Sequence, residues 1–93
     1  MIKAALINEI LNYKDKLGRL DVCIGTHTTA DFTLGYYFDE ESREFKVYKN
    51  GERGICTVRY SGNDECEALK TLLRMVKGRA LTIAEIDKMR DTR

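Results

Sequence analysis

The sequence has no proline and no tryptophan, and it contains only one histidine and three cysteines in 93 residues. An odd cysteine count does not suit the disulfide framework of a small secreted domain, so we expect free thiols and a cytoplasmic protein. Long apolar runs are also missing, which excludes a membrane-spanning helix of about 20 residues. Residues 1–20 lack the unbroken apolar block of a signal peptide.

The charges nearly balance, because 16 basic and 15 acidic side chains leave a net charge of +1. At 43% hydrophobic residues, the chain can build one core, and we predict a single domain over residues 1–93. Residues 21–73 hold six basic and ten acidic side chains, whereas both flanking segments are basic. An acidic middle argues against nucleic acid as the partner and suits a basic protein partner.

Hydrophobic periodicity predicts helices at both ends and strands between them. A helical stripe over residues 1–17 ends at Gly18, and a second stripe, capped by Asn63 or Asp64, ends at Gly78. Thr82 then fits the start of a short last helix. Alternating or β-branched segments predict four strands, at residues 21–26, 32–39, 44–49 and 55–60.

Short links between these strands predict antiparallel pairing. Residues 39–43 form a polar turn, and Asn50-Gly51 is a strong hairpin signal. We therefore predict an α+β fold: a four-stranded antiparallel meander with an N-terminal helix and two C-terminal helices packed on one face.

Alternation assigns the strand residues to two faces of this sheet. The helices should cover six apolar side chains: Phe32, Leu34, Tyr36, Phe38, Phe45 and Val47. The other face should expose four: Thr33, Tyr37, Lys46 and Tyr48. Tyrosines on an exposed face indicate either packing of their rings on lysine stems or a contact site.

The sequence offers no catalytic constellation. His27 is the only histidine, and Cys23 precedes it by four residues, about 13 Å along a strand and beyond hydrogen-bond reach. We interpret His27 as a solvated loop residue. A zinc site from Cys23, His27, Cys56 and Cys66 would lack any paired spacing such as C-x-x-C. We therefore predict a non-enzyme with no metal and no cofactor.

The thiols themselves indicate structural roles. Cys23 and Cys56 lie within strand patterns, where a thiol usually behaves as a small buried hydrophobe. Cys66 lies in the first turn of a helix, which lowers a thiol pKa, but three adjacent acidic residues oppose that effect. The glycines match neither a dinucleotide-binding fingerprint nor a P-loop.

Four acidic residues surround the turn between the second and third predicted strands: Asp39, Glu40, Glu41 and Glu44. Such a run is either a solvated turn or an acidic prong that enters a cationic groove on a partner. It lacks the alternating ligands and the central glycine of an EF-hand.

Residues 31–77 contain an L-G-Y-Y-x-D-E-E strand and turn, a V-Y strand, an E-R-G hairpin and an E-A helix with leucines. With this pattern the segment resembles a family of small α+β immunity proteins of bacterial polymorphic toxin systems. It implies a bacterial, cytoplasmic toxin inhibitor that binds and neutralises its cognate toxin by protein–protein interaction. It also implies that the protein needs neither catalysis nor a cofactor.

Two alternatives belong to other classes. A tyrosine-bearing strand followed by Glu52-Arg53-Gly54 resembles WGR-type nucleic-acid modules, but the tryptophan is missing and the middle zone is acidic. The other is a phage or mobile-element accessory protein that acts as a homodimer through its last helix.

For the immunity function, we predict that the toxin contacts the acidic turn and the outward side chains beside it. The candidate partner-binding residues are Tyr37, Asp39, Glu40, Glu41, Glu44, Tyr48, Glu52 and Arg53. Arg53 is included because arginine is favoured at interface hot spots; its alternative role is to anchor the end of the sheet.

Overall fold

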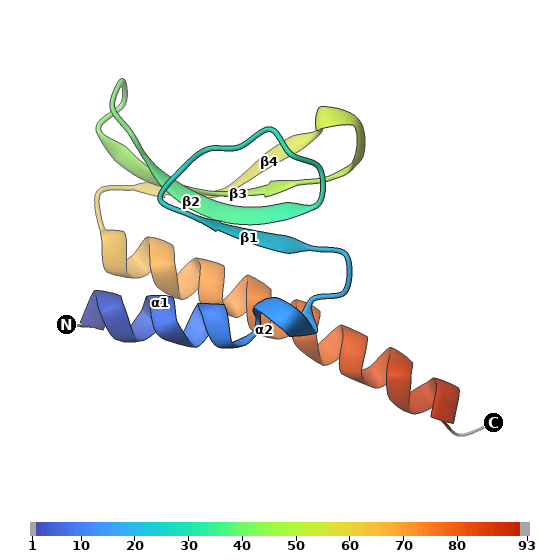
Figure 1. Ribbon diagram of the computed structural model, residues 1–93. Coiled ribbons are helices and arrows are strands. Elements are labelled where there is room, and N and C mark those ends of the chain that lie inside the picture. The colour runs from blue at the N-terminus through green and yellow to red at the C-terminus, as the bar shows by residue number, and fades with distance from the viewer. Residues whose placement is uncertain (1, 92–93) are drawn as a thin grey trace.

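The computed structural model describes the backbone of residues 2–91 and, within that range, the side chains of residues 3–86 and Lys88. Met1, the first residue of the predicted N-terminal helix, lies outside it. The elements are α1 (Ile2–Asn12), η1 (Lys14–Lys16), β1 (Asp21–Ile24), β2 (Thr33–Asp39), β3 (Glu44–Asn50), η2 (Glu52–Gly54), β4 (Cys56–Gly62) and α2 (Glu65–Asp91). The predicted α+β class is confirmed, with both helices under one face of the sheet (Figure 1).

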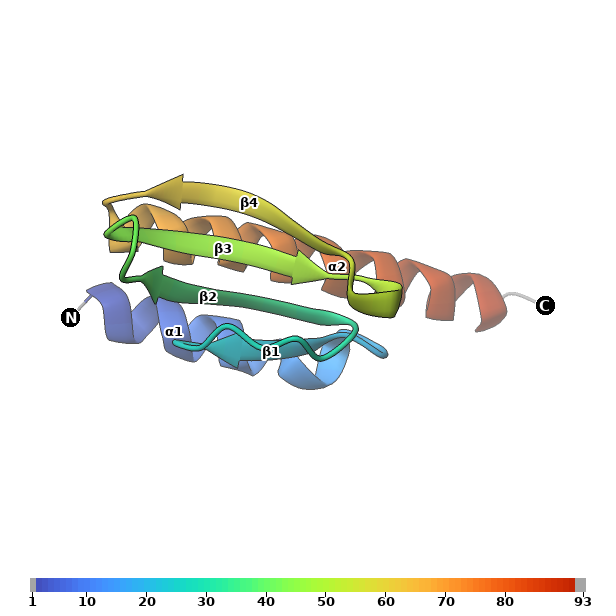
Figure 2. The ribbon, with the colours of Figure 1, turned by 90° about the horizontal axis from the view of Figure 1, so that it is seen from above.

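The strands lie in the order β1-β2-β3-β4, but the prediction that all of them are antiparallel is wrong (Figure 2). β1 pairs with β2 in parallel, and only β2–β3 and β3–β4 are antiparallel. The link over residues 25–32 crosses the face opposite the helices to reach the start of β2 (Figure 1). Since β1 has only four residues, about 13 Å in length, this short link is long enough to return the chain.

Residues 2–91 form two α-helices, whereas the sequence predicted three. Gly78 does not end a helix: α2 continues through it, and the Thr82 hydroxyl donates to the Gly78 carbonyl at 3.0 Å instead of capping a new helix. Packing of Val76 and Ala80, both buried, outweighs the roughly 1 kcal/mol that an internal glycine costs.

The N-terminal helix is shorter than predicted. α1 ends at Asn12, and η1 then turns the chain so that Leu17 enters the core. Gly18 follows with a φ of +66°, a conformation that favours glycine.

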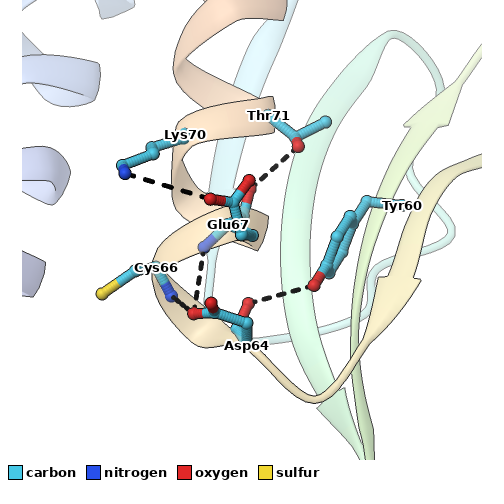
Figure 3. Close-up of polar contacts among 6 residues, drawn as sticks. All are labelled: Tyr60, Asp64, Cys66, Glu67, Lys70 and Thr71. Carbon is cyan, nitrogen blue, oxygen red and sulfur yellow. Dashed lines mark hydrogen bonds and ion pairs between the residues drawn. The ribbon is translucent and has the colours of Figure 1, made fainter.

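Asp64, one of the two caps that the sequence predicted, caps the start of α2 at Glu65 (Figure 3). Its carboxylate accepts hydrogen bonds from the backbone N–H groups of Cys66 at 3.0 Å and Glu67 at 3.3 Å. Its carbonyl accepts a third bond from the Tyr60 hydroxyl at 3.3 Å, which joins the helix start to β4. Asp64 therefore satisfies two of the N–H groups that a helix leaves unpaired at its first turn.

One core lies between the sheet and the helices. Its buried members are Ile10, Leu17, Leu20, Val22, Leu34, Tyr36, Val47, Ala68, Leu69, Leu72, Leu73, Val76 and Ala80. Phe32 and Phe45 are partly buried against it, but Phe38, which we also predicted to be covered, is 43% exposed. The turn ends of β2 and β3 curve away from the helices, which explains the exposure of Phe38 (Figure 1).

The opposite face of the sheet is not open, as we had predicted it to be. The crossing link over residues 25–32 covers part of it, so Thr33 and Tyr48 are buried. Gly35 is the register partner of Tyr48, and the tyrosine ring lies over it. A Cβ atom at Gly35 would lie 2.6 Å from Tyr48 Cζ and 2.7 Å from the Cys23 carbonyl oxygen. Glycine at this position is therefore what lets the ring lie flat against the strands.

We predict that Gly35→Ala lowers the free energy of unfolding by about 1–3 kcal/mol, because the added methyl displaces a buried ring. Gly78→Ala is the matched control, since no atom lies within 4 Å of the added methyl. We expect it to raise the free energy of unfolding by about 0.5–1 kcal/mol. Urea unfolding followed by circular dichroism measures both; equal effects of the two variants would contradict the close contact at Gly35.

Candidate functional site

The acidic turn between β2 and β3 is held by Asp39. The Asp39 carbonyl accepts from the Arg43 N–H at 2.7 Å, and its carboxylate accepts from the Glu41 N–H at 3.0 Å. Lys46 pairs with the same carboxylate at 2.9 Å. The hydrogen bond from Lys46 is the main cause that lowers the pKa of Asp39, and partial desolvation acts in the opposite direction. Asp39 therefore fixes the shape of the turn instead of offering a free charge.

Glu40 and Glu41 are the two free acids of this turn. Both are exposed, and neither forms an ion pair among the described residues. Phe38 precedes Glu40 by two positions in the chain, and its ring meets that of Phe45 at a centroid distance of 5.0 Å. We call Phe38, Glu40 and Glu41 the acidic tip. Glu44, by contrast, accepts a hydrogen bond from the Ser61 hydroxyl at 3.1 Å.

Tyr48 lies away from solvent, although we predicted it at the partner surface. Its hydroxyl donates to the Thr26 carbonyl at 2.8 Å and accepts from the Thr28 N–H at 3.1 Å. Tyr37 is half-buried, and its ring stacks on His27 at 4.7 Å with an interplanar angle of 8°. His27 lies in an exposed loop, as predicted, but its ring is held against the tyrosines.

Asn50 fixes the same link from the end of β3. Its side-chain amide donates to the carbonyls of Thr28 at 2.7 Å and Ala30 at 2.9 Å. The sequence placed Asn50 in the link after a strand that ends at residue 49, but Asn50 is the buried last residue of β3, and the link to β4 runs over residues 51–55. The antiparallel pairing of β3 with β4 that the Asn50-Gly51 signal predicted is nevertheless correct.

Glu52 and Arg53 lie at the opposite end of β3 from the acidic turn, so the predicted partner residues do not form one patch. Both side chains are exposed. The backbone N–H of Arg53, at a φ of 59°, donates to the Asp31 carboxylate at 3.4 Å, and the Gly54 N–H donates to it at 3.3 Å. The anchor at this end of the sheet is thus the backbone of Arg53.

The three cysteines are free and differ in exposure. Cys23 is half-buried and donates to the Thr26 carbonyl at 3.4 Å, while Cys56 is exposed, contrary to prediction, because it lies on the outer face of the edge strand. Its sulfur lies 3.9 Å from His27 Nε2. Cys66 is half-buried in the first turn of α2 (Figure 3).

Among the described residues, no group of three histidine, cysteine or acidic side chains is arranged to hold a metal ion. Nor does any helix in residues 2–91 combine the length and the apolar character needed to cross a membrane.

Comparisons with known protein families, with curated proteins and with solved structures find no match to this chain.

The pKa of the Tyr48 phenol makes the stability of the protein depend on alkaline pH. Burial raises its pKa from 10.0 to about 12, while the hydrogen bond from the Thr28 N–H acts in the opposite direction. The folded state thus retains this proton more tightly than the unfolded state. Its contribution to stability is complete below pH 10 and is lost as the pH rises to about 12.

We expect Tyr48→Phe to lower the free energy of unfolding by about 1–3 kcal/mol at neutral pH, because two partly buried backbone groups of the link lose their hydrogen-bond partner. The variant should also show a smaller fall in stability between pH 10 and about 12 than the parent. Tyr13→Phe is the control, since its hydroxyl has no hydrogen bond among the described residues. Urea unfolding at several alkaline pH values tests this, and identical slopes for all three proteins would contradict it.

Proposed function

We propose that the chain is a non-enzymatic immunity protein that binds and neutralises a cognate protein toxin. The observation that carries the proposal is the acidic tip, which combines an exposed phenylalanine with two unpaired carboxylates in one short segment. Phe38 is 43% exposed, and Glu40 and Glu41 are exposed in the turn that follows it. The hairpin of β2 and β3 that carries this turn curves away from the helices (Figure 1).

The tip is ordered before any partner binds. Two backbone hydrogen bonds to Asp39 and its ion pair with Lys46 hold the turn in one shape. Less backbone entropy is then lost on association, so more of the contact energy contributes to affinity.

The chemistry of the tip suits a basic partner surface. Two carboxylates accelerate association with a cationic groove, such as one that binds nucleic acid, by electrostatic steering. An aromatic side chain at the centre of a contact excludes water and slows dissociation. This combination meets the requirement on an inhibitor that must capture a harmful protein quickly and hold it.

This proposal revises the docking surface expected from the sequence. Tyr48 is excluded because it is buried, and Asp39 serves the turn. Phe38 enters in their place, although its position in the strand pattern assigned it to the covered face. In the sequence, only its position directly before the polar turn sets Phe38 apart from the apolar strand residues that the helices cover.

Charge reversal tests the steering role. We expect Glu40→Lys/Glu41→Lys to lower the association rate at least about tenfold at low salt, with a smaller effect at high salt. The partner to test is the product of the gene immediately upstream of the one that encodes this chain, and surface plasmon resonance measures the rates. Asp15→Lys/Glu85→Lys is the matched control, because both residues are exposed and lie outside the tip.

Phe38→Ala should instead raise the dissociation rate with little change in association. If the control double variant slows association as much as the tip variant, net charge alone drives binding and the assignment to the tip is wrong. If neither tip variant alters protection of toxin-producing cells, the proposal fails.

A further inference from the structure

Two adjoining hollows lie beside Lys49, near the end of β3 away from the acidic tip. In this region α2 diverges from the sheet (Figure 1). The hollows have volumes of about 530 Å³ and 500 Å³, and they share Leu20, Lys49 and Arg79 in their walls. We call them together the basic groove, after five cationic residues that line it: Arg19, Lys49, Arg59, Arg74 and Arg79.

The cations of the groove differ from the paired ones elsewhere on the protein. No acidic residue lines either hollow, and none of the five cations forms an ion pair with a described carboxylate. The lysines that do form ion pairs all lie outside the groove: Lys3, Lys14, Lys46, Lys70 and Lys77. Like charges gathered without counter-charges create a positive potential that attracts anions.

An irregularity in the sheet contributes one of these cations. Val47 pairs with Tyr60 and Tyr48 pairs with Val58, so Arg59 is the extra residue of a β-bulge. Bulges commonly redirect a side chain at a functional position. Here Arg59 lines the hollow together with Arg74 of α2.

Two further cations are held in place by neighbours. Arg79 Nε donates to the Leu17 carbonyl at 3.3 Å, and the Arg19 guanidinium lies 5.1 Å from the centroid of the Phe32 ring. Apolar side chains from the core, including Leu34 and Met75, complete the wall between the charges. The groove thus combines ordered cations with apolar surface.

We propose that the basic groove binds the phosphate backbone of single-stranded nucleic acid. Five cations distributed over two connected hollows match a repeated anion better than an isolated phosphate group. A concave site with apolar walls accepts a flexible strand and its exposed base faces, as in other single-strand binding grooves. A rigid duplex presents its phosphates on a convex surface that does not enter such hollows.

This site is independent of the acidic tip, because the two lie at opposite ends of β3. In the sequence, the excess of acidic over basic residues in positions 21–73 counted against nucleic acid as a partner. That count is misleading for the groove, because Lys49 and Arg59 come from the acidic zone whereas Arg19, Arg74 and Arg79 come from the basic segments on either side. The fold gathers cations that the chain keeps apart.

The test is a salt titration with a fluorescently labelled single-stranded oligothymidine, read by anisotropy. Each phosphate contact on a single strand contributes about −0.7 to the slope of log K against log salt concentration. Full use of the five cations gives a slope of about −3.5. A slope near zero, or no binding at low salt, would overturn the proposal.

Arg59→Gln/Arg74→Gln removes two exposed cations that make no hydrogen bond or ion pair among the described residues. We expect the slope to become about 1.4 less steep and the affinity at ~0.1 M salt to fall roughly 25-fold. Lys14→Gln/Lys70→Gln changes the net charge equally outside the groove and should leave the slope unchanged. Circular dichroism verifies that each variant is folded.

Three competitors of the labelled single strand, and a test of self-association, show whether something else occupies the basic groove. A duplex of the same length or polyglutamate that binds as tightly as the single strand would overturn the proposal in favour of general polyanion binding. Inorganic phosphate that displaces the strand at equal concentration would assign the groove to a small anion. If sedimentation shows salt-sensitive self-association that Arg59→Gln/Arg74→Gln abolishes, the occupant is the acidic turn of a second copy.

Discussion

The arrangement of the sheet depends on the hydrogen bonds between the Tyr48 hydroxyl and the link over residues 25–32. The hydroxyl joins β3 to this link, which carries the chain from β1 to β2, and Asn50 adds two further bonds to it. These bonds give partners to backbone groups that are partly buried where the link lies on the sheet. The link can therefore lie flat on the sheet, and β1 can pair in parallel with its neighbour. Without Gly35 beneath the ring, the phenol would not reach this position.

The alternation of apolar and polar residues was sufficient to predict the sheet's two long central strands. It identified the inward side chains of β2 and β3, and the polar run after Asp39 gave the turn that joins them. Strand direction for β1 could not be read this way, because a link of eight residues suits either direction when the strand is so short. The deciding contacts join residues about 20 positions apart, and no local pattern reveals them.

The candidate sites show a similar division between local and long-range information. The acids of the turn could be found from the sequence, since consecutive charged residues remain close in any fold. Phe38 was assigned to the core because alternation gives the face of a strand residue but not where the covering helix stops. The basic groove was invisible for a further reason: its cations come from four elements or links, and one of them depends on a bulge.

Gly78 connects the stability of α2 with the shape of the groove. The sequence suggests a helix end there, yet α2 continues, and Gly78 lines the larger hollow between Arg74 and Thr82, one turn away on either side. An internal glycine costs a helix about 1 kcal/mol relative to alanine. In return, its missing side chain leaves open part of the hollow that Arg74 and Arg79 also line, since no atom lies within 4 Å of where a Cβ atom would be. A larger residue at this position would stabilise the helix but would occupy part of the hollow. Gly78 therefore keeps the hollow open at the cost of some helix stability.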